Sequence, residues 1–182
     1  MGRFYDPGVP VGEVRPGYEL WRPNREKPAS VTTKWLTVLL LLLTAGLAAL
    51  ITIGGWSVLE GGGGMGIVCA IYAILYFCFA FLVARWRRGI LPLAAALSMI
   101  LAIFCAVGAS SWFERDKAGF AEAGLPSSLL GTLVIVLGLL QLVLIGFALF
   151  GFNQDWHVEE ERPIGSGEDY GAGAAGGAPQ PA

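Results

Sequence analysis

The sequence predicts an all-α integral membrane protein: an antiparallel bundle of four transmembrane helices with both termini in the cytoplasm. Three observations predict this fold class. Hydrophobic residues make up 55% of the 182 residues and charged residues only 14%, against roughly 25% charged residues in ordinary globular proteins. The hydrophobic residues are concentrated in four long runs, and the lysines and arginines are divided unevenly between the segments that connect these runs.

Each of the four runs is long enough to cross the hydrocarbon layer as a helix, which takes about 20 residues. None of them contains Asp, Glu, Lys, Arg or His. A helix that is apolar on every face is typical of a lipid environment. The predicted spans are residues 35–53, 65–84, 90–109 and 129–150. The chain is thereby divided into an N-terminal arm (1–34), a transmembrane domain (35–151) and a C-terminal tail (152–182).

The distribution of basic residues predicts the orientation. The arm, the link RWRRG (residues 85–89) and the tail hold all the lysines and arginines except Arg115 and Lys117, which lie in the link before the fourth run. Basic residues in short loops stay in the cytoplasm, so both termini and the RWRRG link are expected there. The first run starts only at residue 35, so no cleavable signal peptide is expected. The excess of arginine over lysine indicates a bacterial plasma (inner) membrane.

The tryptophans near the ends of the runs indicate the same orientation. An indole ring prefers the headgroup level of a membrane, where one edge is wet and the other apolar. Trp35, Trp86 and Trp156 are expected at the cytoplasmic interface, and Trp56 and Trp112 at the outer interface.

The three arginines of the RWRRG link have two interpretations. Arg85, Arg87 and Arg88 lie between two apolar runs, which is an ordinary place for residues that set topology. Binding to anionic lipid, at about 1 kcal/mol for each basic residue, is the alternative. We favour the topological role and expect membrane lipid to be a partner at this interface.

Small residues recur at every fourth position of the third run. Such a row lets two helix backbones approach closely. It turns by about 40° at each step on an ideal helix, so only its middle can face one neighbour. A contact inside the bundle is favoured over one between copies of the chain. The row consists of Ala94, Ser98, Ala102, Ala106 and Ser110.

Gln141 is the one strongly polar residue near the middle of the fourth run, and Gly131 and Gly138 share its helix face. A lone amide in hydrocarbon needs a hydrogen-bond partner, and such bonds contribute about 0.6 to 2 kcal/mol. We expect it to hold the helices together, with a contact to a transported solute as the alternative. The candidate partners are Thr44, Thr52, Tyr72, Tyr76 and Ser98.

The sequence offers no set of residues for catalysis, a cofactor or a metal. The three cysteines lie inside predicted spans without a Cys-x-x-Cys pair, which favours packing over redox chemistry. The one histidine, His157, follows the last span, and Glu60 lies in a turn. No ionisable residue lies at membrane depth, where coupled transporters carry one. We therefore expect no enzyme, no cofactor and no metal site.

The two terminal segments differ in composition. The arm is rich in proline and lacks apolar periodicity, so most of it is expected to be irregular, with PGYELWRPN as its most ordered part. The tail is acidic and then rich in Gly, Ala and Pro, which predicts disorder. Their opposite charges allow mutual attraction, but two independent tails are favoured. A short amphipathic helix is expected near residues 112–123.

These observations favour a small membrane protein without enzymatic activity, an accessory or scaffolding subunit that acts through protein partners. The partner is expected to be another membrane protein or a second copy, with no nucleic acid and no small-molecule substrate. The alternative is a subunit of an oligomeric transporter or channel, with Gln141 on a polar path. The absence of a catalytic set of residues favours the first hypothesis over an enzyme. The transport alternative is weaker than the first hypothesis because it depends on a single amide.

Overall fold

The computed structural model describes residues 14, 16–59, 63–114 and 122–165. It is mostly helical, and its described part contains four helices that are long and apolar enough to cross a membrane, as predicted. These helices are α2 (Pro28–Gly54), α3 (Gly63–Ala84), α4 (Ile90–Trp112) and α5 (Ser127–Asn153). The shorter elements are β1 (Tyr18–Trp21), α1 (Pro23–Glu26), the 3-10 helix η1 (Trp56–Val58) and β2 (Glu160–Pro163).

The helix ends lie close to the predicted ones except at the start of α2. This helix begins at Pro28, whereas the apolar run begins at residue 35. Proline suits the first position of a helix because its φ is already helical and it has no N–H to satisfy. The polar residues that follow continue the helix, and Ser30 and Thr33 are buried. The amphipathic helix expected near residues 112–123 falls largely on residues outside the described part of the chain.

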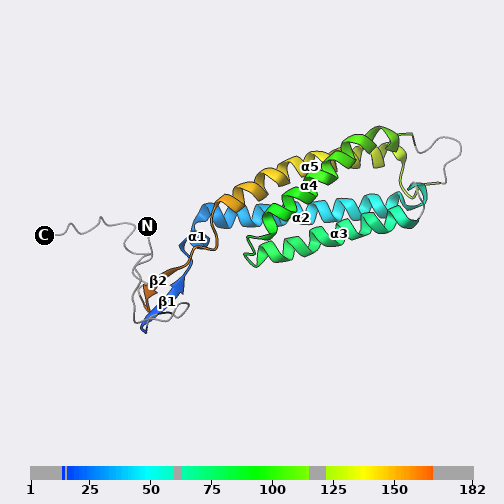
Figure 1. The fold of residues 1–182 in the computed structure, drawn as a ribbon. Helices are drawn as coiled ribbons and strands as arrows, with labels where there is room; N and C mark the ends of the chain where they lie inside the picture. The colour runs from blue at the N-terminus through cyan, green and yellow to red at the C-terminus, as the bar shows by residue number, and fades with distance from the viewer. Residues whose placement is uncertain (1–13, 15, 60–62, 115–121, 166–182) are drawn as a thin grey trace.

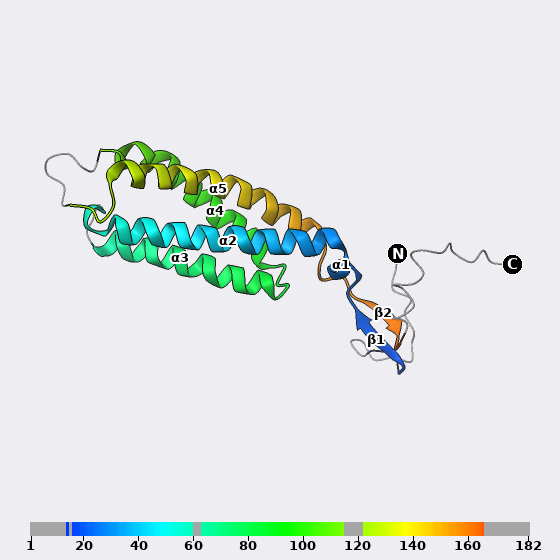
Figure 2. The same cartoon turned by 180° about the vertical axis from the view of Figure 1, so that it is seen from behind.

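The four long helices form two antiparallel pairs (Figures 1 and 2). α3 lies along α2, α4 lies along α5, and the contact between α2 and α5 joins the pairs. α3 and α4 meet at the RWRRG link that connects them and separate towards the opposite end (Figure 1). We call these two ends of the bundle the RWRRG end and the Trp112 end.

The buried residues of α5 alternate between spacings of three and four. A mean spacing of 3.5 residues places side chains as knobs between those of a neighbouring helix, at a shallow crossing angle of about 20°. The same repeat runs along α4, where buried residues recur every seven positions at Leu91, Ser98, Cys105 and Trp112. Ser127 and Gly131 are buried as well, and the positions of α5 that follow this alternation are Leu130, Val134, Leu137, Gln141, Leu144, Ala148 and Gly151.

The arm and the tail pair with each other, contrary to the favoured expectation of two independent segments. β1 and β2 form an antiparallel ladder in which Leu20 faces Glu161. Arg22 forms an ion pair with Glu159, and Arg162 Nε lies 2.7 Å from Glu19 Oε1. The first pair joins a basic residue of the arm to an acidic residue of the tail, and the second joins an acidic residue of the arm to the arginine of the tail. Disorder was predicted for the whole tail, residues 152–182, and this is wrong for residues 160–163, which form β2 because they pair with the arm. Residues 166–182 lie outside the described part.

Candidate functional site

A polar cluster at the centre of the bundle joins all four long helices. Gln141 of α5 is fully buried. Its carbonyl oxygen accepts a hydrogen bond from Tyr76 Oη of α3 at 3.0 Å, and its amide donates to Thr44 Oγ1 of α2 at 3.3 Å. Tyr76 Oη lies 3.3 Å from Ser98 Oγ of α4. The amide also donates to the Leu137 carbonyl at 3.1 Å. The donors and the acceptor of this amide are therefore all used inside the protein.

Three of the five candidate partners of Gln141 belong to this cluster, and two do not. Thr52 Oγ1 donates instead to the Ala48 carbonyl of its own helix at 2.6 Å. The ring of Tyr72 packs near that of Tyr76, with centroids 6.5 Å apart. A hydroxyl that bonds its own helix backbone has no need of a partner across the bundle.

At the Trp112 end, the separation of α3 and α4 leaves a cavity of about 600 Å³. Two hydroxyls on its wall bond their own helices: Ser111 Oγ donates to the Gly108 carbonyl at 2.8 Å, and Thr52 Oγ1 donates to the Ala48 carbonyl at 2.6 Å. A wall of this kind accommodates apolar material such as a lipid chain or the side chains of another helix. The lining includes Ile51, Thr52, Met65, Cys69, Tyr72, Phe104, Cys105, Gly108, Ser111 and Trp112.

At the RWRRG end, α3 stops in an unusual conformation at Trp86. The Arg87 N–H donates to the Leu82 carbonyl at 3.1 Å and the Trp86 N–H donates to the Val83 carbonyl at 2.8 Å. This is the Schellman pattern, in which the residue after the helix is left-handed and usually glycine. Here Trp86 adopts a φ of 61°. A left-handed conformation costs an ordinary residue about 1 to 2 kcal/mol, so the contacts of its ring must offset this cost.

The indole ring of Trp86 is surrounded by two cations and a second indole. Its centroid lies 5.1 Å from that of Trp156 in an edge-to-face arrangement. Lys34 Nζ lies 4.3 Å from the ring centroid and the guanidinium carbon of Arg25 lies at 5.7 Å. Both distances are within the range of cation–π attraction. Trp86 therefore joins the start of α2, the α3–α4 link and the segment that follows α5.

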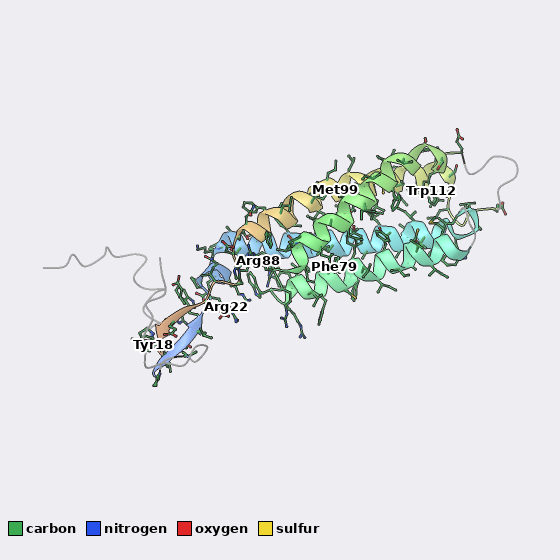
Figure 3. The ribbon with its side chains drawn as sticks, in the orientation of Figure 1. Tyr18, Arg22, Phe79, Arg88, Met99 and Trp112 are labelled. Carbon is green, nitrogen blue, oxygen red and sulfur yellow. The ribbon has the colours of Figure 1, made fainter. Side chains whose placement is uncertain are left out.

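Arg88 binds the end of α5 (Figure 3). Its Nε donates to the Phe152 carbonyl at 2.7 Å, and its Nη2 lies 2.7 Å from Asp155 Oδ1. Its Nη1 lies 2.9 Å from His157 Nδ1. Because a guanidinium can only donate, Nδ1 is the acceptor in this contact. Arg88 thus satisfies one of the carbonyls that a helix end leaves unpaired, and it is engaged within the protein rather than directed at lipid.

The predicted interface tryptophans fall into two groups. Trp35 and Trp56 are about half exposed at opposite ends of the bundle, as expected for an interface. Trp156 is fully buried beneath Trp86, and Trp112 is nearly so. These two differ from the expectation because protein, not lipid, surrounds their rings. Trp112 packs so closely on Gly55 that a Cβ there would lie 2.7 Å from the ring.

The row of small residues in α4 faces the protein only at its start. Ala94 and Ser98 are buried, Ala102 is half-buried, and Ala106 and Ser110 are exposed. Residues spaced by four positions shift around the helix axis at each step, whereas the buried residues of α4 recur every seven positions. The later members of the row therefore lie outside the buried interface of α4.

The two glycines of α5 contact neighbouring side chains as packing residues do. A Cβ at Gly131 would lie 2.6 Å from the ring of Phe113, and one at Gly138 would lie 3.0 Å from Cβ of Cys105. Glycine at these positions lets the end of α4 approach α5 closely.

No individual role of Lys34 or Arg25 is predicted from the sequence, where both are only basic residues of the arm. Lys34 is buried, with 7% of its surface exposed, and its Nζ lies 4.4 Å from the ring centroid of Trp35. A lysine directly before an apolar run and next to a tryptophan is the signal that could have singled it out, because both side chains favour the headgroup level.

Other chemistry is sparse in the described part of the chain. Cys69, Cys78 and Cys105 are free thiols, and no three His, Cys, Asp or Glu side chains there come together as a metal site. Comparison of the chain with protein-family models, with curated proteins and with solved structures finds no match. The function is therefore argued from the geometry of the RWRRG end, the central cluster and the cavity.

Proposed function

We propose that this chain is a multi-pass protein of the plasma (inner) membrane with both termini in the cytoplasm. In this proposal it is an accessory or scaffolding subunit without enzymatic activity, and it acts through protein partners. The four long helices support the membrane part, because each exceeds the roughly 30 Å of the hydrocarbon layer at 1.5 Å per residue. The basic RWRRG link and arm support the orientation.

The observation that carries the accessory role is the platform formed by β1 and β2. These strands come from opposite ends of the chain, and their small sheet projects beyond the RWRRG end of the bundle (Figures 1 and 2). It presents apolar side chains to its surroundings, with Leu20 51% and Ile164 67% exposed. A two-stranded sheet is marginally stable in water, so contact with a partner protein would stabilise it and cover these side chains.

The central polar cluster favours this role over transport. A residue on a polar path must offer a donor or an acceptor to the solute. Both amide hydrogens of Gln141 are already donated, to Thr44 and to the Leu137 carbonyl, and its carbonyl oxygen already accepts from Tyr76. This arrangement supports the interpretation of Gln141 as a residue that holds the four helices together.

The first test is to purify the tagged full-length protein from its own membranes in mild detergent and to determine the mass of the intact assembly. A stoichiometric foreign subunit is expected. The platform is tested with Arg22→Glu, with Glu159→Arg and with the double variant, because the two residues form an ion pair. Each single variant should lose the subunit and the double variant should recover it.

A pure homo-oligomer would contradict the accessory role and would return attention to transport. If all three variants retain the foreign subunit equally, that subunit binds elsewhere than at the platform. Orientation is tested separately with fluorescent-protein fusions at each terminus, which should both fluoresce if both ends are cytoplasmic. Extraction of the protein from membranes by alkaline carbonate would contradict integral insertion.

A further inference from the structure

The Lys34 ammonium is a buried charge with no anionic partner among the described residues. It lies between the indole rings of Trp35 and Trp86, 4.4 and 4.3 Å from their centroids, and the residue is only 7% exposed. Aromatic faces attract a cation, by about 2 kcal/mol when it is desolvated. A buried charge nevertheless remains costly unless an opposite charge pairs with it. Lys34 therefore needs an anion that the described residues do not supply.

A second cation, Arg25, lies near the same ring, with its guanidinium carbon 5.7 Å from the ring centroid. Its Nε donates to the Trp156 carbonyl at 2.9 Å, and among the described residues its terminal nitrogens have no hydrogen-bond acceptor. Burial lowers the pKa of Arg25, and the charges of Arg22 and Arg87 lower it further while Glu159 opposes them. Glu159, the carboxylate whose charge acts on Arg25, is itself paired with Arg22.

The nearby carboxylates are already engaged with other arginines. Glu159 pairs with Arg22, and Asp155 pairs with Arg88. No carboxylate of the described residues forms an ion pair with Lys34, Arg25 or Arg87.

The level of this cluster along the bundle identifies the kind of anion. From Trp35 to the end of α2 at Gly54 the helix is about 30 Å long at 1.5 Å per residue, which equals the hydrocarbon thickness. Lys34 therefore lies where the hydrocarbon meets the headgroups when the bundle spans a membrane. The anions at that level are the phosphates of lipid headgroups, and the cytoplasmic leaflet is the one that attracts basic segments.

The backbone at Trp86 is consistent with a site that is formed in advance. Trp86 holds a left-handed φ of 61° that would favour glycine, and this conformation places the ring against Lys34 and Arg25. Strained residues that persist in this way are concentrated at ligand sites.

We propose that Lys34 and Arg25, which lie against the ring of Trp86, together with Arg87, the next residue in the chain, bind the phosphate group of an anionic membrane lipid on the cytoplasmic side. The proposal rests on the membrane insertion and orientation proposed above. An ammonium supplies a compact charge and a guanidinium supplies paired donors, and a phosphate accepts from both. The lipid would neutralise the buried ammonium and attach the start of α2 to the α3–α4 link.

The test uses the purified full-length protein in a non-ionic detergent, titrated with phosphatidylglycerol or phosphatidylcholine and followed by native mass spectrometry. Phosphatidylglycerol should bind at least about fivefold more tightly, since each cation contributes about 1 kcal/mol. Lys34→Met should remove about fivefold of the affinity for phosphatidylglycerol. The matched control is Lys27→Met, because Lys27 is exposed on the same side and bonds only Asn24; its affinity should change less than twofold.

Equal binding of phosphatidylglycerol to the wild type and Lys34→Met would overturn the proposal. Inorganic phosphate is titrated in a separate arm. Saturation by phosphate that depends on Lys34, without any preference between the lipids, would assign the site to a soluble phosphate compound instead. Thermal unfolding without lipid tests whether Lys34→Met still folds, and its midpoint should stay or rise because an unpaired buried charge is removed.

These outcomes are separate from those of the proposed accessory role. The titration uses the purified chain alone, so the absence of a partner protein does not affect it. Carbonate extraction is measured on native membranes before any detergent is added. A chain that is not membrane-integral fails there, whereas a chain that is integral but lacks the lipid site fails only in the titration.

Discussion

The two ends of the bundle are built from the same four helices but are closed to different degrees. At the RWRRG end, Trp86 packs on the buried Trp156 and Arg88 binds the end of α5. At the Trp112 end, α3 and α4 separate around a cavity of about 600 Å³. The difference teaches that polar and aromatic contacts of connecting segments, rather than the apolar runs, determine where this bundle is tight. Four changes test that comparison, in order of decreasing expected effect.

Arg88→Met should have the largest effect, a loss of about 3 kcal/mol in the free energy of unfolding. The change removes three polar contacts, to the Phe152 carbonyl, Asp155 and His157, and the stacking of the guanidinium on the Phe152 ring. Hydrogen bonds to charged groups contribute about 1.5 to 3 kcal/mol each before partial exposure is discounted. Unfolding in mixed detergent micelles measures it. Arg87→Met is the control and should cost less than about 0.5 kcal/mol. Equal losses of unfolding free energy in Arg88→Met and Arg87→Met would contradict the conclusion that Arg88 holds the RWRRG end together.

Ala94→Leu should destabilise the tight end by about 1 to 3 kcal/mol, because added methylenes strain a filled core. Ala94 is fully buried in α4. At the open end, Gly108 of the same helix lines the cavity, and an added Cβ there would meet no atom closer than 3.9 Å. Gly108→Leu should therefore cost nothing beyond Gly108→Ala, which controls for helix propensity. A large cost of Gly108→Leu relative to that control would mean that the cavity is filled.

Gln141→Leu should cost about 0.6 to 2 kcal/mol, the range of polar contacts between membrane helices. The cluster lies between the two ends and belongs to all four helices. A double-mutant cycle with Tyr76→Phe isolates the Tyr76–Gln141 hydrogen bond. Additive losses in this cycle would show that the two side chains do not depend on each other for stability.

The smallest effect, about 1 kcal/mol, concerns the backbone of Trp86. Trp86→Gly should be more stable than Trp86→Ala, because both lose the indole contacts but only glycine adopts a φ of 61° without strain. The order reverses that of ordinary helix propensity, in which alanine is the better residue. The comparison is made by thermal unfolding of the two variants. If alanine proves the more stable, the left-handed conformation is not retained in the variants.

Much of the fold could be predicted because its signal is local. Runs such as residues 90–109 contain no charge over their whole length, and only a helix satisfies its backbone in lipid. The pairing of β1 with β2 could not be predicted in this way. Arg22 and Glu159 are 137 positions apart, and no short-range pattern connects residues at that distance.

The candidate sites divide similarly. Gln141 stood out because an amide is rare in an apolar run, and Thr44, Tyr76 and Ser98 were among its possible partners, but only the packing of four helices selected them over Thr52 and Tyr72. The small-residue row was visible in the sequence, yet its outer half, Ala106 and Ser110, is exposed. The helices follow a repeat of seven, and a spacing of four drifts away from it.

By itself the sequence determined the number, approximate position and apolar character of the four helices, because these depend only on which residues are neighbours along the chain. Tertiary structure alone decided that the arm and the tail join, that Arg88 binds the end of α5, and that Lys34 lies buried between two indole rings. The physical reason is that a charge or a ring reveals its role only through what surrounds it, and distant segments supply those surroundings here.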